Sequence, residues 1–318
     1  MKTMQLGDTD LEVSRICFGC WQLSPKFWGE VALEPWEEAL KKALDIGVNF
    51  IDTANAYGDG HAETSLGEFL KREGLRDEFI LATKFYWNFE EEPRYPDTRY
   101  DSILKECEAS LKRLQTDRID LYQIHATDPL TRPDEVAKAL LKLRDEGKVR
   151  WFGVSNQNPE VMRMYQEHFR VSSLQPRYNM LQRDIEKHEF PYCIAENVGV
   201  MVYSPLARGL LSGKYAPDHV FDDPRGPEPL FSGEAFRRIV EGTEALRPFA
   251  DKYGLTIAQL AIRWVLTHPA VTCAIVGIKT VEHIETIAPA ADEDLPPDDW
   301  HKMAKIMDAA STEALALT

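Results

Sequence analysis

The chain has 318 residues, 44% hydrophobic and 28% charged, with a formal net charge of −15 at pH 7. This composition is typical of a folded globular protein and excludes a mainly disordered chain. The negative charge repels phosphate backbones, so we expect no nucleic-acid partner. No apolar run approaches the length of a membrane-spanning helix, and the first residues resemble neither a signal nor a transit peptide. We therefore expect no membrane insertion and a cytoplasmic protein.

The cysteines point to the same compartment. They are odd in number and scattered along the chain, which favours free thiols. The spacing of Cys17 and Cys20 is that of a redox or zinc motif, but no second pair or histidine cluster accompanies it. We interpret both as core residues of a strand, and the others are Cys107, Cys193 and Cys273.

Strand-like segments alternate with helical ones along the chain. A short hairpin is predicted first, from residues 4–6 and 11–13, and is expected to plug one end of the fold. Apolar residues then recur at helical spacing from Trp36 to Gly47, from Ile103 to Leu114 and from Pro133 to Gly147. Eight strands are predicted at residues 16–20, 48–51, 79–82, 119–124, 149–154, 171–174, 200–203 and 272–276.

This alternation predicts an α/β fold of one domain, residues 1–318, in which eight parallel strands form a (β/α)8 TIM barrel. A doubly wound sheet is disfavoured because no GxGxxG or P-loop follows the first strand. Residues 206–233 form a long loop after the seventh strand, rich in Gly, Pro and Asp, which is expected to be functional. The tail from Asp292 reads as helical and then alanine-rich.

Polar residues cluster where the predicted strands end, which is where such barrels place their active sites. Asp52 and Tyr57 follow the second strand, Lys84 the third and His125 the fourth. A lysine beside a phenol stabilises the phenolate and lowers the tyrosine pKa, Asp52 would hold the lysine, and His125 would donate a hydrogen bond to a carbonyl oxygen. Each residue alone also has a purely structural explanation: a strand cap, an ion pair, loop packing or a core histidine.

Several segments resemble the aldo-keto reductase family, in its bacterial or channel-β-subunit-like branch. They are Asn49-Phe-Ile-Asp-Thr-Ala-Asn-Ala-Tyr57-Gly, Ala82-Thr-Lys84, Asp120-Leu-Tyr-Gln-Ile-His125, Gly147-Lys-Val-Arg-Trp-Phe-Gly-Val-Ser-Asn156 and Tyr203-Ser-Pro-Leu-Ala-Arg-Gly-Leu-Leu-Ser-Gly-Lys214. The resemblance implies a nicotinamide-dependent reductase of carbonyls, sugars among them, with Tyr57 as general acid. It further implies no metal and a small-molecule carbonyl or alcohol as partner.

The resemblance also implies a set of cofactor-binding residues. Ser155, Asn156 and Gln175 would bind the carboxamide of nicotinamide, whose ring would stack on Tyr203. The pyrophosphate would lie under the loop after the seventh strand, and Lys279 would pair with a 2′-phosphate. The full set is Asp52, Ser155, Asn156, Gln175, Tyr203, Ser204, Pro205, Leu206, Gly209, Lys214, Gly277, Lys279 and His283.

The adenine-side motif departs from the pattern of the family. Val276 replaces a proline, His283 replaces a glutamine, and Thr286 and Ile287 replace the adenine-reading Glu-Asn pair. NADP(H) is favoured because Lys279 is kept, and NAD(H) is the alternative. Substrate contacts are predicted for Trp21, Tyr57, Trp87 and His125, within an aromatic wall that also includes Phe27, Trp28, Tyr86 and Phe89.

Two other functions compete with a reductase. Some relatives serve as slowly turning cofactor-binding subunits of membrane channels, and an intact tetrad does not distinguish them. A metal-dependent barrel enzyme is disfavoured, because the nearest ligand pairs, His61 with Glu63 and Asp222 with Asp223, do not lie at strand ends beside a second histidine.

Overall fold

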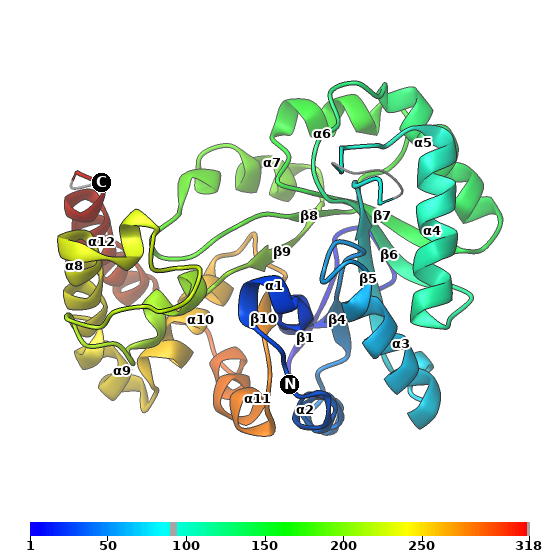
Figure 1. The fold of residues 1–318 in the computed structure, drawn as a ribbon. Coiled ribbons are helices and arrows are strands. Elements are labelled where there is room, and N and C mark those ends of the chain that lie inside the picture. Colours follow the sequence, from blue (N-terminus) through cyan, green and yellow to red (C-terminus); the bar gives the residue numbers. More distant parts are fainter. Residues whose placement is uncertain (90–93, 317–318) are drawn as a thin grey trace.

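Eight parallel strands close into a barrel in the computed structural model, which describes residues 1–89 and 94–316 (Figure 1). The order around the barrel follows the chain, and β10 pairs with both β3 and β9 to complete the circle. The predicted TIM barrel is therefore confirmed. The strands are β3 (Ile16–Gly19), β4 (Phe50–Asp52), β5 (Ile80–Phe85), β6 (Ile119–Ile124), β7 (Val149–Ser155), β8 (Ser173–Gln175), β9 (Gly199–Tyr203) and β10 (Cys273–Gly277).

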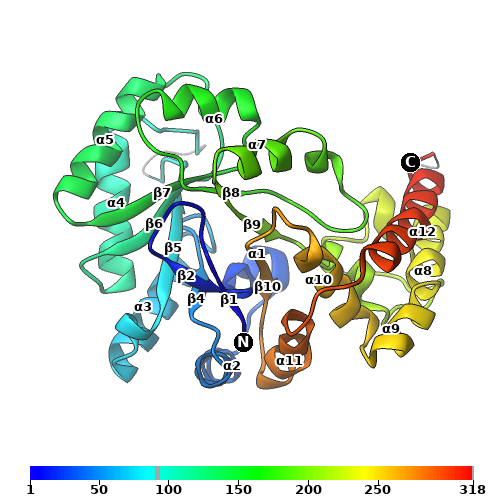
Figure 2. The ribbon, with the colours of Figure 1, turned by 180° about the vertical axis from the view of Figure 1, so that it is seen from behind.

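The hairpin closes the end of the barrel where the strands begin (Figure 2). Its strands, β1 (Thr3–Gln5) and β2 (Glu12–Ser14), pair antiparallel with Met4 opposite Val13. Leu6, Leu11 and Val13 are fully or almost fully buried and form one apolar cluster with the inward-facing residues of the barrel. The hairpin therefore acts as the predicted plug.

Helices surround the barrel, and the three helical patterns of the sequence correspond to α2, α4 and α5. Near the C-terminus, α8 packs on α12 to one side of the barrel (Figure 1), and the stacked rings of Trp264 and Trp300, 4.6 Å apart, fix α12 to α10. The helices are α1 (Pro25–Trp28), α2 (Leu33–Asp45), α3 (His61–Glu73), α4 (Tyr100–Leu114), α5 (Pro133–Asp145), α6 (Pro159–Gln166), α7 (Glu189–Ala195), α8 (Gly233–Glu244), α9 (Arg247–Tyr253), α10 (Ile257–Thr267), α11 (Val281–Ile287) and α12 (Pro297–Leu315).

The loop after β9 has more internal structure than its composition predicts. Turns of 3-10 type occur in Ala207–Ser212, where the backbone kinks at Arg208 and Gly209, and in Pro229–Phe231. Phe221 and Phe231 are buried. Ion pairs join Arg208 to Glu228 and Arg225 to Asp223. Both phenylalanines belong to the main apolar core of the protein, and the last residue of the loop, Gly233, already begins α8.

Strand ends differ from the predicted ones mainly at β5, which continues past residue 82 through Thr83 and Lys84 because both side chains find buried partners. All five cysteines are buried and free. Within the described ranges, no helix combines the length and the apolar sequence needed to cross a lipid bilayer.

Candidate active site

Strand alternation brings the predicted site residues into the mouth of the barrel. Phe50, Ala82 and Leu121 face the barrel interior, where they pack in one cluster with the plug. Successive side chains of a strand point to opposite faces, so the residues two positions later also face inward. These are Asp52 on β4, Lys84 on β5 and Gln123 on β6, and His125 follows by the same alternation.

Lys84 is the centre of the site. Its side chain is fully buried, and its ammonium group donates hydrogen bonds to Asp52 Oδ1 at 2.7 Å, to the Thr53 carbonyl at 2.8 Å and to Tyr57 Oη at 3.1 Å. Burial alone would lower the pKa of Lys84, but Asp52 and Tyr57 outweigh it and raise the pKa above its usual range. Lys84 therefore stays a cation beside the phenol.

The pKa of Tyr57 is raised, whereas the sequence predicts that Lys84 lowers it. Lys84 does lower this pKa, as expected, but burial raises it by more, and the net result is a pKa of about 12. The reason is that a phenolate at this position loses its hydration. Tyr57 therefore keeps its proton at neutral pH and can still donate it.

His125 lies across the site from Tyr57, with ring centroids 6.0 Å apart and ring planes at 80°. Burial and then the charge of Lys84 lower the pKa of His125 to about 3, so the imidazole is neutral at physiological pH. Its Nδ1 is buried and has no partner within the described residues. A neutral imidazole has one N–H that can donate a hydrogen bond.

On the opposite side, β7, β8 and β9 bring the predicted carboxamide-binding residues together. Gln175 donates from Nε2 to Asp52 Oδ2 at 2.8 Å, so Asp52 joins the two halves of the site. Ser155 donates to the Gln175 carbonyl at 2.9 Å and accepts from Asn156 at 3.0 Å. Tyr203 donates to Asn156 Oδ1 at 3.0 Å.

Cations gather at the other end of the predicted cofactor site. The guanidinium of Arg225 lies 5.9 Å and the ammonium of Lys279 5.4 Å from the ring centre of Trp28. Burial lowers the pKa of Lys279, and the charges of Arg225 and Lys214 lower it further. Lys214 and Lys279 form no ion pair within the part of the chain that the structure describes. Arg225 is paired with Asp223, but the two lysines bring further positive charge to this end of an acidic protein, which fits a polyphosphate ligand.

The other residues predicted to bind the cofactor lie on or next to β9, β10 and α11. Ser204, Pro205 and Leu206 follow β9, and Ser204 has a φ of +55°. Gly209 has a φ of +101°, a conformation that favours glycine, in a turn that bends the loop back. Gly277 ends β10 against the side chain of Gln22, and His283 lies exposed on α11.

The aromatic residues form two groups at the mouth. Trp21 packs on Phe27 at 5.7 Å and on Trp28 at 5.2 Å, in the segment that follows β3. Tyr86 packs on Trp87 at 4.8 Å after β5. Trp28 lies with the cations described above and is therefore closer to the cofactor side than predicted; Phe89 lies under the guanidinium of Arg94, 4.7 Å away.

Comparison with known proteins identifies the family of this barrel. Residues 15–308 match the sequence profile of the aldo/keto reductase family. The chain belongs to this family. It is an aldo-keto reductase, an NAD(P)H-dependent oxidoreductase acting on carbonyl and CH–OH groups.

Individual relatives match over nearly the whole chain. An aldo-keto reductase of Bacillus subtilis is 34% identical over 311 residues, 97% of this chain and 94% of that protein. The NADH-specific methylglyoxal reductase of Escherichia coli is 29% identical over 324 residues, 97% and 99% of the two chains. The structure of a glycerol dehydrogenase from Gluconobacter oxydans superposes with a TM-score of 0.89 at 33% identity, covering 97% of this chain and 96% of that one.

Two further residues of this aldo-keto reductase, Gln123 and Arg225, lie in the site and are not among the predicted site residues. The side chain of Gln123 lies between Asp52 Oδ2 and Gln175, at 3.5 and 3.4 Å, and strand alternation from Leu121 could have indicated its inward position. Arg225 joins the cations through the fold of the loop, and no local spacing indicates this.

Two of the four residues in the possible metal-ligand pairs, Glu63 and Asp223, have other partners. Glu63 accepts hydrogen bonds from Thr83 at 2.6 Å and from Arg113 at 2.7 Å. Asp223 pairs with Arg225. Their carboxylates therefore tie helices and loops together.

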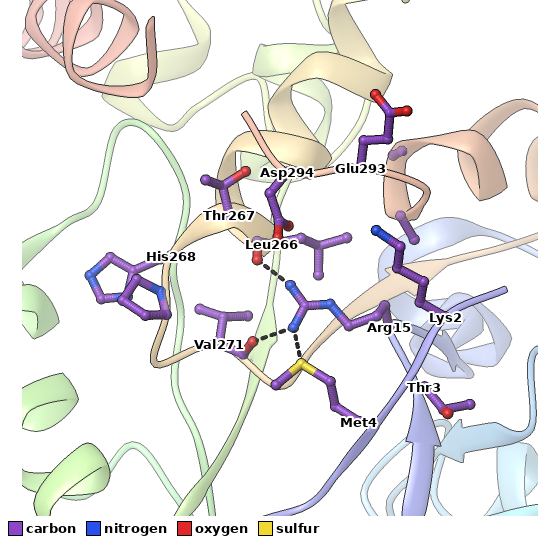
Figure 3. A pocket seen from close by; sticks show the side chains of 13 residues that line it. Lys2, Thr3, Met4, Arg15, Leu266, Thr267, His268, Val271, Glu293 and Asp294 are labelled. Carbon is purple, nitrogen blue, oxygen red and sulfur yellow. Dashed lines mark hydrogen bonds between the residues drawn. The ribbon is translucent and has the colours of Figure 1, made fainter. Parts of the chain in front are cut away.

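A separate cavity of about 200 Å³ lies at the end of the barrel where the strands begin, and it contains none of the predicted site residues (Figure 3). Buried Arg15 projects into it from the start of β3 and donates to the carbonyls of Leu266, near the end of α10, and Val271. A cation at a helix C-terminus is stabilising. The position of Arg15 therefore indicates a role in fastening α10 to the barrel.

Proposed function

We propose that this aldo-keto reductase reduces aldehyde and ketone carbonyls, sugars among them, with NADP(H) as the preferred cofactor and Tyr57 as the general acid. The observation on which this rests is the buried ammonium of Lys84, which contacts both Asp52 Oδ1 and Tyr57 Oη. A fixed cation beside a neutral phenol stabilises the phenolate that remains once the proton has left.

The cofactor would lie across the mouth of the barrel. Ser155, Asn156 and Gln175 would bind its carboxamide, and the ring of Tyr203 would support the nicotinamide. The segment from Ser204 to Lys214 would cover the pyrophosphate. When bound, the reduced cofactor supplies the hydride that is added to the carbonyl carbon.

Protein side chains would supply the proton and stabilise the charge. As negative charge develops on the carbonyl oxygen, Tyr57 gives its hydroxyl proton to that oxygen. Lys84 stabilises the resulting phenolate, and Asp52 keeps Lys84 in place. Neutral His125 donates a hydrogen bond to the same oxygen, which orients the substrate. The aromatic residues Trp21 and Trp87 would form the wall of the substrate site.

The preference for NADP(H) is supported by charge. Lys279 belongs to the group of cations on Trp28 and has no carboxylate partner in the described chain. Two observations argue against this preference. The adenine-reading Glu-Asn pair is lost, and the Escherichia coli relative is specific for NADH. NAD(H) is therefore the alternative outcome of the test.

We further propose that the chain acts in the cytoplasm as one barrel domain spanning residues 1–318. The five buried free cysteines support a reducing compartment. The family match over residues 15–308 and the plug formed by the first residues support the domain assignment.

Oxidation of NADPH and NADH, measured side by side with methylglyoxal, glyceraldehyde and aromatic aldehydes, tests the proposal. In the Tyr57→Phe variant we expect kcat to fall at least about a hundredfold while the Kd for NADPH stays near that of wild type. Near-normal turnover in that variant would remove Tyr57 from the role of acid. Absence of turnover in the wild type with every carbonyl would argue against the proposed function as a whole.

A further inference from the structure

Among the side chains of the segment between Asp52 and Tyr57, that of Asn55 forms a hydrogen bond within the described structure. Thr53 Oγ1 is buried without a partner in the described structure, and the two alanines carry no polar side-chain atoms. Asn55, which is 1% exposed, donates from Nδ2 to Glu106 Oε2 at 2.9 Å. The family resemblance assigns no role to Asn55, although it lies two residues before the phenol.

Backbone bonds hold this segment unevenly. Thr53 N–H donates to the Ala82 carbonyl at 2.9 Å, which fixes the start of the segment. Asn55 N–H reaches the Lys84 carbonyl only at 3.5 Å, the long limit of a hydrogen bond. Tyr57 N–H bonds back to Ala54 within the segment itself, at 3.1 Å. Lys84 Nζ also donates to the Thr53 carbonyl at 2.8 Å, and the Tyr57 carbonyl accepts from Ala62 N–H at 3.1 Å, so both ends of the segment are held. In its middle, the Asn55 side chain supplies the strong link to a neighbouring element.

That neighbouring element is rigid. Glu106 lies in the middle of α4, a helix of 15 residues that packs on both α3 and α5. The carboxyl group is buried, and burial raises the pKa of Glu106, while the hydrogen bond from Asn55 lowers it. A buried carboxylate needs a donor, so the bond is costly to break from either side.

We propose that Asn55 and Glu106 form a positioning pair, which ties the segment before Tyr57 to α4 and so sets the distance between the Tyr57 hydroxyl and the Lys84 ammonium. The inference rests on the proposed role of Tyr57 as acid. Proton transfer depends steeply on distance and alignment, so a looser segment lowers the rate of the chemical step. Neither residue is expected to touch cofactor or substrate.

Asn55→Ala is the first test, with Asn49→Ala as its matched control. Asn49 lies just before the same strand, β4, at the opposite end of the barrel, and its side chain accepts from Ser14 N–H and donates to the Glu12 carbonyl, both at 2.8 Å. We expect Asn55→Ala to lower kcat at least about tenfold with the Kd for NADPH within about twofold of wild type. Asn49→Ala is expected to lower the Tm while leaving kcat unchanged.

A charge swap separates positioning from a general loss of stability. Asn55→Asp places two carboxyl groups against each other and is expected to lower kcat. Glu106→Gln keeps an acceptor oxygen and is expected to stay near wild type. The double variant Asn55→Asp with Glu106→Gln reverses donor and acceptor, and we expect it to recover kcat to within about threefold of wild type. No recovery in the double variant, or an equal kcat loss in Asn49→Ala, would overturn the proposal.

A measurement that does not depend on turnover distinguishes the positioning pair from the proposed reductase function. With 13Cζ-labelled tyrosine, the NMR resonance of Tyr57 is assigned by its loss in Tyr57→Phe. We expect that resonance to shift or broaden in Asn55→Ala, to stay in place in Asn49→Ala and to return in the double variant. An inactive wild type with this pattern would reject the proposed function and keep the positioning pair. An active wild type in which Asn55→Ala changes neither resonance nor kcat would reject the pair alone.

Discussion

At the scale of single residues, burial decides which protons are available in the site. It raises the pKa of Tyr57 to about 12 and lowers that of His125 to about 3. Both groups are therefore neutral across the physiological range, and each keeps a hydrogen to donate. Lys84, held by Asp52, remains the fixed charge. The site is thus arranged to stabilise negative charge that appears only during reaction.

The pKa of His125 makes stability depend on pH. An unfolded chain binds a proton at histidine near pH 6.5, whereas folded His125 stays neutral to about pH 3. Stability is thus lost as pH falls from about 6.5 toward 3. Because the side chain is partly exposed, we expect about 1 kcal/mol of loss between about pH 7.5 and about pH 5 that is absent in His125→Gln. Urea unfolding at both pH values measures it, and equal losses in the two proteins would contradict it.

Substitution of Lys279 tests whether this single residue sets the preference for NADPH over NADH. Lys279→Met removes a charge that would contact the 2′-phosphate, so the binding free energy of NADPH should weaken by about 1.5–3 kcal/mol. This corresponds to a rise in Kd of roughly ten- to 150-fold. NADH lacks this phosphate, and its Kd should change little. Quenching of protein fluorescence by each cofactor gives both constants. Equal weakening of the two would show that Lys279 does not read the phosphate.

At the scale of elements, strands and loops divide the work. Barrel strands hold Asp52, Lys84 and Gln175 in register, because their backbones are hydrogen-bonded on both sides. The loop after β9 packs Leu210, Leu211, Phe221 and Phe231 into the main apolar core, whereas residues 216–220 within it are exposed. A segment with few buried contacts opens more readily than the packed segments on either side of it.

We therefore expect residues 206–233 to act as a lid. Exposed Lys214, with Arg225 and Lys279, would contact the anionic cofactor once it has docked, and the loop would then become ordered. Hydrogen exchange should show protection of this loop when NADPH is added. Lys214→Ala should speed NADPH release more than it slows association in stopped-flow fluorescence. Identical protection with and without saturating NADPH would reject the lid and leave the enzyme assignment intact.

At the scale of the whole molecule, stability and chemistry lie at opposite ends of the barrel. The plug residues Leu6, Leu11 and Val13 are buried where the strands begin, while Tyr57 and His125 follow their ends. Leu11→Ala should cost about 2–5 kcal/mol of unfolding free energy, because it leaves a cavity in this core. Its kcat at a temperature where it stays folded should match wild type. Leu130→Ala, at a position 92% exposed, is the control and should be neutral in urea unfolding.

Local sequence patterns were enough to predict the barrel and the four polar residues at its mouth. Eight apolar strands separated by helices allow few closed arrangements, and strand ends place Asp52, Lys84 and His125 on one rim. These are local signals: alternation, spacing and residue type. The strand bounds shifted by a few residues where polar side chains such as Thr83 found buried partners.

Features that depend on the depth of burial and on contacts between distant segments follow from the folded molecule alone. The pKa of Tyr57 rises because burial outweighs Lys84, and no spacing in the sequence reports how much water a phenol retains. Arg225 joins Lys279 on Trp28, and Asn55 meets Glu106, because segments far apart in the chain fold side by side. Residue type sets what chemistry is available, but desolvation and proximity are properties of the packed molecule.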